Sequence, residues 1–391
     1  MKELRRDINL SKRKEVSKMN CLRRCWAEID LSAIEYNLSR YRKYLRDSTE
    51  LLCVVKANCY GHSDNLVIPH LEKLGVRWFA VSNLIEAEHL RTLGVKGEII
   101  ILGYSPEENA DDLIKFNIIQ ACTEYSYAVK LNENATQGKV RIHAAIDTGM
   151  TRIGLHGDTA SNADEIQKML RLENLSVEGM FTHYAVADSQ EEESIAYTKA
   201  QTEKILALDD ELKRRGVNLG CVHFLNSAGG VHCPTERSAL ARLGIILYGL
   251  YPDPSDPLPF EPKPAMELKA VISQVKYIEK GTTVSYGRTF TADKRIKLAT
   301  VTAGYADGFP RSLSNKGEVI IKGIRCPVVG RICMDQFMCD VSDVADAAVG
   351  DVVTLFGKQI TADDIAQLTG TIGYEIVCGI TARVPRIEAR K

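Results

Sequence analysis

Short apolar runs alternate with longer amphipathic stretches from about residue 51 to residue 250. Intervening segments such as NLIEAEHLRTLG have apolar positions at helical spacing. Strands that are buried on both faces read as continuous apolar runs, so this alternation predicts a parallel sheet covered by helices. Eight such runs predict a closed (β/α)8 TIM-like barrel. They are residues 51–56, 78–82, 99–103, 118–122, 141–147, 177–183, 221–226 and 239–243.

After about residue 260 the pattern changes to short runs of alternating polarity separated by turns, as in KLATVTAGYADG and GEVIIKGIRCPVVG. This pattern is typical of antiparallel strands and predicts a second, mainly antiparallel β domain. The segment TADDIAQLTG predicts a short helix with Thr361 as its N-cap. The predicted organisation is a basic tail over 1–21, a strand over 22–31 that joins the β domain, the barrel over 32–258 and the β domain over 259–391.

Composition removes several classes of function. Fifty basic and fifty-one acidic residues give a net charge of −1, which does not predict a nucleic-acid partner. No uncharged apolar run approaches the roughly 20 residues of a membrane span. The basic tail predicts a solvated extension rather than a functional element. Eleven scattered cysteines and no leader-like start favour free thiols in a cytoplasmic protein, and Cys21, Cys25, Cys333 and Cys339 are better read as buried thiols than as metal ligands.

In a (β/α)8 barrel, polar residues at the carboxyl ends of strands form the active site. Lys56 ends the first apolar run, where burial would favour a neutral, nucleophilic amine suited to an aldehyde cofactor or to proton transfer. Its position alone favours the alternative of a strand-end lysine that extends to water. The other polar residues at predicted strand ends are Arg152, His183, Asn226, Ser227 and Arg242.

The loops after the seventh and eighth predicted strands suit a phosphate group. Ser227 follows the seventh strand, and Gly244 and Ile245 follow the eighth and open the segment GIILYGL, which predicts one short helix. Barrels often bind phosphate with these loops and with the amino end of such a helix. A tight turn that requires glycine for backbone reasons explains these residues equally well.

The chain carries an ordered set of motifs in both predicted domains, namely VVKANCYGH, DTGMTRIG, EGMFTHYAVAD, NSAGG, RLGIILYGLYP, SYGRTF, AGYADGFPR, GRICMDQFMCD, GYEI and RVPR. From roughly residue 22 to residue 388, this set resembles the alanine racemase family. The resemblance implies fold-type III binding of pyridoxal 5'-phosphate and a homodimer whose active sites combine residues of both chains. It also implies an isomerase that supplies D-alanine for peptidoglycan.

By this resemblance, Lys56 holds the cofactor and is the base for D-alanine, and Tyr286 is the base on the opposite face. Arg242 donates to the pyridine nitrogen, and His183 connects Arg242 with Tyr286. Because a guanidinium keeps its protons, the ring nitrogen would stay unprotonated, which favours return of a proton to Cα. This arginine disfavours a related decarboxylase. A third possibility, a non-enzymatic cofactor carrier, leaves the β domain and Tyr286 unexplained.

The resemblance assigns the remaining binding roles as follows. The phosphate is surrounded by Tyr60, Ser227, Gly244, Ile245 and Tyr374. Arg152 lies at the cofactor oxygen and the substrate carboxylate, and the backbone N–H of Met334 from the partner chain makes a second carboxylate contact. Taken alone, each of these residues would be read as ordinary surface or core.

One position departs from the family pattern. Many members carry a carbamylated lysine seven positions before the arginine of the DTGM motif, where this chain has Ala145. Arg152 therefore needs another anionic partner, such as chloride, or is held less firmly. Similar catalytic domains occur in the serine racemases of vancomycin-resistance systems, which makes serine the alternative substrate. The bulky Tyr374 favours alanine, with serine as a weaker substrate.

Overall fold

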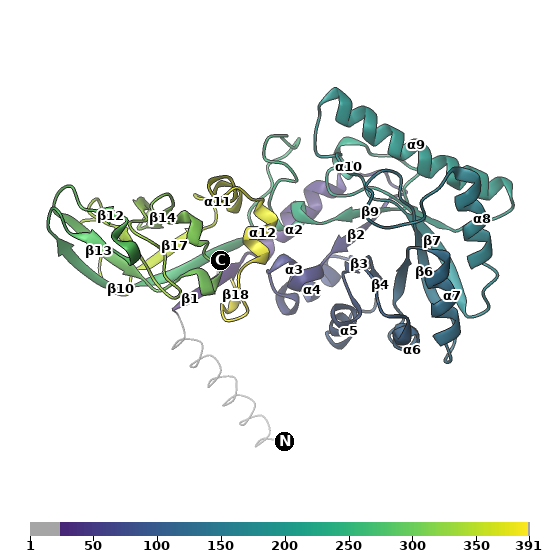
Figure 1. Ribbon diagram of the computed structural model, residues 1–391, viewed down its shortest axis with the longest axis horizontal. Coiled ribbons are helices and arrows are strands. Elements are labelled where there is room, and N and C mark those ends of the chain that lie inside the picture. Colours follow the sequence, from purple (N-terminus) through teal and green to yellow (C-terminus); the bar gives the residue numbers. More distant parts are fainter. Residues whose placement is uncertain (1–23, 390–391) are drawn as a thin grey trace, which may run out of the picture. The chain divides into compact units, whose positions relative to one another are not determined.

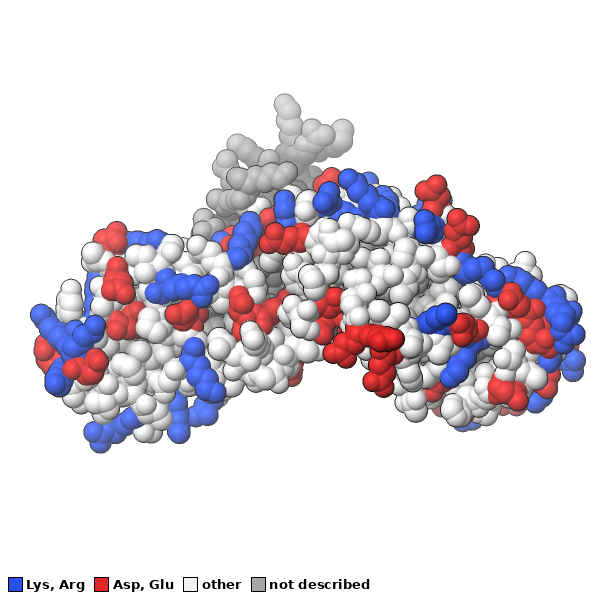
Figure 2. All heavy atoms as spheres, turned by 90° about the horizontal axis from the view of Figure 1, so that it is seen from above, with Lys and Arg blue, Asp and Glu red and all other residues white. Residues whose placement is uncertain are grey.

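The computed structural model describes residues 24–389, which form two compact units. One unit comprises residues 31–263, and the other comprises residues 24–30 together with residues 264–389. The basic tail predicted over 1–21, including Cys21, lies outside the described residues. None of the helices in the described part of the chain is long and apolar enough to span a membrane. Over the face in Figure 2, basic and acidic side chains of the described residues are interspersed.

The first unit is a parallel barrel with helices around it (Figure 1). Its eight-stranded sheet has the order β8-β7-β6-β5-β4-β3-β2-β9, and a parallel bridge between Leu225 and Ala241 closes the ring. The prediction of an eight-stranded (β/α)8 barrel is confirmed. The strands are β2 (Glu50–Val54), β3 (Trp78–Val81), β4 (Glu98–Ile101), β5 (Ile119–Cys122), β6 (Val140–Ala145), β7 (Leu175–Phe181), β8 (Cys221–His223) and β9 (Leu240–Leu243).

The helices of this unit fill the intervals between strands, and polar caps mark where some of them begin. The side chain of Asn83 accepts a hydrogen bond from the Glu86 N–H, and that of Asp158 accepts one from Ser161. The helices are α2 (Leu31–Arg42), α3 (Lys56–Tyr60), α4 (Asp64–Lys73), α5 (Leu84–Thr92), α6 (Ala110–Lys115), α7 (Tyr125–Asn134), α8 (Thr159–Met169), α9 (Glu192–Arg214) and α10 (Gly229–His232), with the 3₁₀ turns η1 (Glu107–Asn109) and η2 (Ile245–Tyr248).

The second unit is a mainly antiparallel β structure that includes the first described strand. That strand, β1 (Cys25–Ile29), pairs antiparallel with β10 (Met266–Ile278) and parallel with β18 (Arg386–Glu388). Thr361 caps α11 (Ala362–Thr369), and Asp364 completes the capping box, so the predicted cap is confirmed. The other elements are β11 (Thr283–Val284), β12 (Phe290–Thr291), β13 (Ile296–Val301), β14 (Glu318–Ile321), β15 (Ile324–Pro327), β16 (Phe337–Asp340), β17 (Val352–Phe356), α12 (Gly373–Cys378), η3 (Tyr286–Arg288), η4 (Tyr305–Asp307) and η5 (Arg311–Leu313).

The cysteines differ in burial. Cys25 and Cys339 are free and buried, as the interpretation as buried thiols requires, whereas Cys333 is partly exposed. Burial raises the pKa of the Cys25 thiol to about 12, which keeps this group protonated at neutral pH.

One buried carboxylate connects three distant segments of the β unit. Asp307 is fully buried and accepts hydrogen bonds from Arg24 at 2.7 and 2.9 Å, from Arg383 at 2.8 Å and from the Gly304 N–H at 2.9 Å. Although burial opposes ionisation, the hydrogen bonds from Arg24 and Arg383 hold the pKa of Asp307 below its usual value. The carboxylate thereby fixes the segment before β1, the turn η4 and the segment before β18.

Replacing Asp307 by asparagine is expected to lower the free energy of unfolding by roughly 2 kcal/mol, because a neutral amide cannot replace a carboxylate between two guanidinium groups. Urea unfolding of the wild type and the variant at neutral pH measures the loss. The matched control is Asp346→Asn, which removes an exposed ion pair with Lys322. Equal stability of the two variants would contradict the role of Asp307.

Candidate active site

Arg242 lies inside the barrel, on β9, and only 2% of its surface is exposed. Its Nη1 donates to Nδ1 of His223 at 3.0 Å and to the His223 carbonyl oxygen at 3.2 Å. Its Nη2 donates to the Thr182 carbonyl oxygen at 2.7 Å and approaches Nδ1 of His183 at 3.3 Å. Its Nε is buried and has no hydrogen-bond partner among the described residues. Such a donor requires an acceptor from outside the chain.

His183 follows β7 and is held in one tautomer by Arg242. Because a guanidinium can only donate, Nδ1 of His183 is the acceptor and its proton resides on Nε2. Burial, followed by the positive charges of Arg242, Arg152 and Lys56, lowers the pKa of His183 to about 3. The structure thus brings three of the predicted cationic residues near one neutral imidazole.

Three predicted phosphate-binding residues converge on Gly244. The Ser227 hydroxyl accepts a hydrogen bond from the Gly244 N–H at 2.8 Å. A Cβ atom at Gly244 would lie 3.1 Å from the Tyr60 hydroxyl oxygen and 3.5 Å from Ser227 Oγ. Ile245 begins η2 directly after this glycine, where the predicted short helix is a 3₁₀ turn. A glycine flanked by two hydroxyl groups at the start of a helical turn forms a cradle that a phosphate fits.

Replacing Gly244 by alanine is expected to lower the affinity for a phosphate-bearing ligand about tenfold, because the methyl group would occupy this cradle at close contact. Titration of the ligand-free protein with pyridoxal phosphate as a probe, followed by absorbance, measures the change. Pyridoxal without its phosphate is the matched control ligand. Equal losses of affinity for both ligands would contradict a phosphate cradle at Gly244.

Lys56 lies two residues after β2, at the start of an unusual turn. The next four residues, Ala57 to Tyr60, all have φ between 51° and 55°, the left-handed region that L-residues seldom occupy. Glu86 supports the turn, because its carboxylate accepts hydrogen bonds from the Ala57 and Ser82 N–H groups at 2.8 Å each. Strain of this kind often occurs at functional sites. Lys56 is exposed, which agrees with the alternative of a strand-end lysine that extends to water and not with a buried amine.

Arg152 lies in the loop that follows β6. Asp147 orders this loop by accepting hydrogen bonds from the N–H groups of Gly149 and Thr151 at 2.9 Å each. Arg152 itself is exposed and makes no hydrogen bond or ion pair with any described residue. Ala145 packs in an apolar cluster with Ala121 and Phe181 and therefore offers no anionic group. The guanidinium of Arg152 is available for an anion from outside the chain.

The other three predicted site residues lie in the β unit. Tyr286 begins η3 and is 70% exposed, directly after Ser285, whose hydroxyl donates to the Arg331 carbonyl oxygen at 2.6 Å. Met334 lies three residues beyond Arg331 and is 52% exposed. The hydrogen bond from Ser285 therefore places Tyr286 near the loop that carries Met334. Tyr374 is a partly buried residue of α12.

Comparisons with known proteins match nearly the whole chain. The family models "Alanine racemase, N-terminal domain" and "Alanine racemase, C-terminal domain" match residues 29–252 and 265–388. The chain belongs to the alanine racemase family. It is 42% identical to alanine racemase 1 of Clostridium acetobutylicum over 373 residues, which cover 94% of this chain and 95% of the relative.

Solved structures of alanine racemases agree in fold. One from Clostridium difficile superposes with a TM-score of 0.87 at 40% identity, over 93% of this chain and 95% of that one. A Bacillus anthracis alanine racemase with bound L-Ala-P superposes with a TM-score of 0.87 at 33% identity, over 94% and 95% of the two chains. The resemblance seen in the sequence is thereby confirmed. These relatives are named alanine racemase and give no support to the serine racemase alternative.

Sequence reasoning missed several residues that support this alanine racemase site. Glu86, which holds the turn after Lys56, reads in the sequence only as a charged residue on an amphipathic helix. His143 and His223 are both fully buried, and His223 contacts Arg242. A histidine within an otherwise apolar run of a predicted barrel strand is the signal that could have marked them.

The neutral histidines inside this barrel have a consequence for stability. Burial lowers the pKa of His143 to about 4 and that of His223 well below its ordinary value. With His183, three imidazoles stay neutral in the folded state at a pH at which the unfolded chain would bind protons. Stability is therefore fully present above a pH of about 6.5, the ordinary histidine pKa, and is lost as the pH falls toward the folded-state values.

The barrel is expected to lose about 1.4 kcal/mol of unfolding free energy for each such histidine between pH 7.5 and 5.5. Urea unfolding at several values between pH 7.5 and 5.5 measures this slope. His143→Asn should reduce this pH dependence by the contribution of about one histidine. His156→Gln, which changes an exposed side chain, should leave it unchanged. An identical slope in the wild type and His143→Asn would contradict the assignment.

Proposed function

We propose that the chain interconverts L- and D-alanine with pyridoxal 5'-phosphate as its cofactor. The observation that carries the proposal is Arg242, a buried guanidinium whose Nε–H lacks an acceptor. The pyridine nitrogen of the cofactor is an acceptor of the required kind. The cradle at Gly244 and the amine of Lys56 lie at the same carboxyl ends of the barrel strands as Arg242. When bound, pyridoxal phosphate withdraws electrons from the Cα of an attached amino acid and thereby makes its proton acidic.

Two bases are needed to invert a carbon centre, one on each face. Lys56 holds the cofactor through its ε-amine and removes the proton from D-alanine or returns it there. Tyr286 does the same on the opposite face for L-alanine. His183 donates from Nε2, the nitrogen that Arg242 leaves protonated, and so connects Arg242 with the Tyr286 oxygen. These donors stabilise the phenolate that a tyrosine must form to act as a base.

Arg242 controls where the proton returns. Burial lowers its pKa to about 10, so the guanidinium stays charged at neutral pH and donates without giving up a proton. Arg242 would thereby leave the ring nitrogen of a bound cofactor unprotonated and limit electron withdrawal into the ring, which would favour return of the proton to Cα over transfer of the amino group. The same property disfavours a decarboxylase, and a non-enzymatic carrier would not require Tyr286.

The remaining residues bind and orient. Tyr60, Ser227, Gly244, Ile245 and Tyr374 surround the phosphate. Arg152 and the Met334 N–H bind the carboxylate of the substrate, and Tyr286 lies against that substrate. A guanidinium joined by a main-chain donor suits a small amino acid.

A homodimer with shared active sites completes the proposal. Tyr286, Met334 and Ile372 are large apolar side chains that are 70%, 52% and 59% exposed in the single chain. Their exposure supports contact with a second subunit, which would supply Tyr286 and Met334 to the site. The cellular role that follows is supply of D-alanine for peptidoglycan in the cytoplasm.

The test is incubation of the purified, cofactor-loaded protein with L-alanine in deuterated water. Loss of the Cα proton together with formation of D-alanine is the expected result, with L-serine reacting more slowly. Exchange without inversion would contradict the assignment of two bases. No exchange by protein that contains the cofactor would overturn the proposal.

A further inference from the structure

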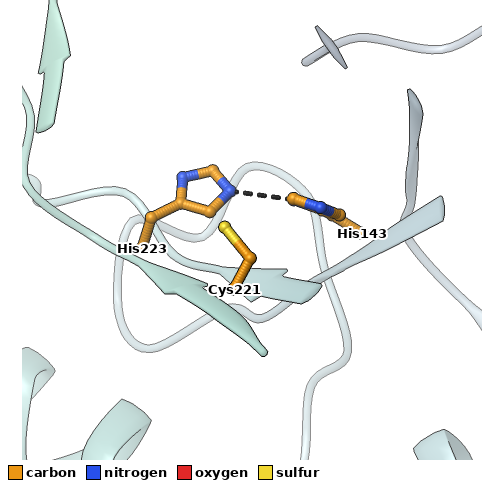
Figure 3. A group of neighbouring side chains, drawn as sticks. All are labelled: His143, Cys221 and His223. Carbon is orange, nitrogen blue, oxygen red and sulfur yellow. Dashed lines mark hydrogen bonds between the residues drawn. The ribbon is translucent and has the colours of Figure 1, made fainter. Parts of the chain in front are cut away.

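Two more imidazoles continue inward from Arg242 through the interior of the barrel. His223 on β8 and His143 on β6 are both fully buried, and Nε2 of His223 lies 3.1 Å from Nδ1 of His143. Figure 3 shows the two rings joined by this contact, with the thiol of Cys221 pointing toward them. On its other side, Nδ1 of His223 accepts from Nη1 of Arg242 at 3.0 Å.

Arg242 determines where the protons lie along this chain of contacts. A guanidinium has no lone pair to offer, so Nδ1 of His223 must be the acceptor and Nε2 must carry the proton. His223 then donates to Nδ1 of His143, and the proton of His143 resides on Nε2. That last nitrogen is buried and has no partner among the described residues. Both rings are neutral because burial lowers their pKa values.

The side chains of His143, Cys221 and His223 are close enough to hold a metal ion, since their ligand atoms lie within 4.8 Å of one another. The proton assignment argues against that use. Nε2 of His223 would have to present a lone pair to a metal, which would place a proton on Nδ1 against the N–H of Arg242. A cation would also lie close to a buried guanidinium. The geometry favours a hydrogen-bond chain over a metal site.

We propose that His223 and His143 are positioning residues that orient Arg242 so that its Nε–H is directed at the cofactor ring. This inference rests on the proposed function. The four N–H groups on Nη1 and Nη2 have acceptors available in His223, Thr182, His183 and Phe224. The Nε–H is the remaining donor. His143 acts through His223, because it accepts the His223 proton and so keeps the Nδ1 lone pair facing Arg242.

Gly179 makes room for this arrangement. A Cβ atom at this position would lie 2.9 Å from Cε1 and Nε2 of His143 and 2.3 Å from the Cys221 carbonyl oxygen. A side chain there would displace the His143 ring or the edge of β8. The two histidines therefore keep this arrangement only with a residue that has no side chain at position 179 of β7.

The first experiment compares His223→Leu, which removes the acceptor, with His223→Asn, whose amide oxygen can accept from Nη1. Each cofactor-loaded variant receives L-alanine, and the ratio of pyruvate to D-alanine is measured. Pyruvate reports transamination, in which the amino group passes to the cofactor, the cofactor becomes its amine form and water releases pyruvate. A ring nitrogen that loses its fixed donor is free to take a proton, and this favours transamination.

His223→Leu is expected to raise the ratio at least about tenfold, and His223→Asn to stay within about threefold of the wild type. His143→Leu should shift the ratio in the same direction, and His143→Asn, which keeps an acceptor, should not. A lower kcat with an unchanged ratio in both leucine variants would indicate a merely structural role and overturn the proposal.

The second experiment needs no turnover and separates this inference from the proposed function. Nitrogen-15 NMR of the histidine-labelled wild-type protein should show His223 and His143 as neutral Nε2–H tautomers from pH 6 to pH 8. A proton on Nδ1 of His223, a charged ring, or binding of added zinc by the two histidines and Cys221 would overturn the inference. A wild-type protein with these tautomers but no racemisation would instead contradict the proposed function.

Discussion

Replacing Lys56 by alanine is expected to abolish racemisation, with a loss of at least about 10⁴-fold, because one side chain is proposed both to hold the cofactor and to act as a base. The variant should also lose the covalent attachment. Borohydride reduction of the loaded wild type followed by peptide mass analysis should place the mass of the cofactor on Lys56. The same treatment of the variant should leave every lysine unmodified. The fold should persist, because the Lys56 side chain is exposed.

The matched control is Lys73→Ala, which removes an exposed lysine at the end of α4 in the same unit. This control should keep its activity and the modified Lys56. Covalent cofactor on another lysine, or racemisation by Lys56→Ala within tenfold of the wild type, would refute the assignment of Lys56.

Replacing Tyr286 by phenylalanine is expected to lower turnover by about 10² to 10⁴-fold and to leave the cofactor bound. Only the hydroxyl oxygen is removed, so the base for L-alanine is lost and Lys56 keeps its own role. In deuterated water, D-alanine should still exchange its Cα proton with little L-alanine formed. L-Alanine should neither exchange nor invert. Proton NMR with chiral analysis of the product measures exchange and inversion separately.

Tyr277→Phe is the control for this substitution, because Tyr277 is 61% exposed and lies on β10 of the same unit. It should racemise at the wild-type rate. Equal exchange of both enantiomers by Tyr286→Phe would show that another group serves the second face and would remove Tyr286 from the mechanism.

Much of the fold could be predicted because barrel strands are buried on both faces. Such strands need uninterrupted apolar residues, which is the pattern that a sequence shows most directly. Phe79, Ile100 and Leu243 are fully buried, as their runs predicted. The end of the seventh strand was less predictable. The run over 221–226 predicts one strand, but β8 ends at His223, and the chain makes one further parallel bridge at Leu225 before it turns at Ser227 toward α10.

The identities of the candidate site residues could be predicted from motifs. Their placement could not be predicted where it depends on the backbone conformation or on contacts across the barrel. Motifs identify Arg242 and His183, and the structure places Nη2 of Arg242 3.3 Å from Nδ1 of His183. The exposure of Lys56 agrees with the alternative that its position at a strand end favours, but the four left-handed residues that follow it could not be predicted from their types, since only glycine signals such a conformation. The contact between His143 and His223 joins residues 80 positions apart through the barrel interior. Local pattern carries no information on such a pair.

The β unit is made of two separated pieces of chain, and this has a consequence for the order in which the two units fold during synthesis. Ile29 of β1 pairs with Met266 of β10, so the first strand of the β unit emerges from the ribosome before the whole barrel does. At 5–20 residues per second, β1 waits about 10 to 50 s for this partner, and longer for β18. A folded barrel shortens the search that follows. The side chain of Asn37 in α2 accepts a hydrogen bond from the Lys263 N–H at 2.8 Å and donates one to the Lys263 carbonyl oxygen at 2.9 Å. These bonds join the first helix of the barrel unit to its last residue. The two separated pieces of the β unit therefore begin at neighbouring points, and the nascent barrel serves as a template that offsets much of the entropy of closing a long loop.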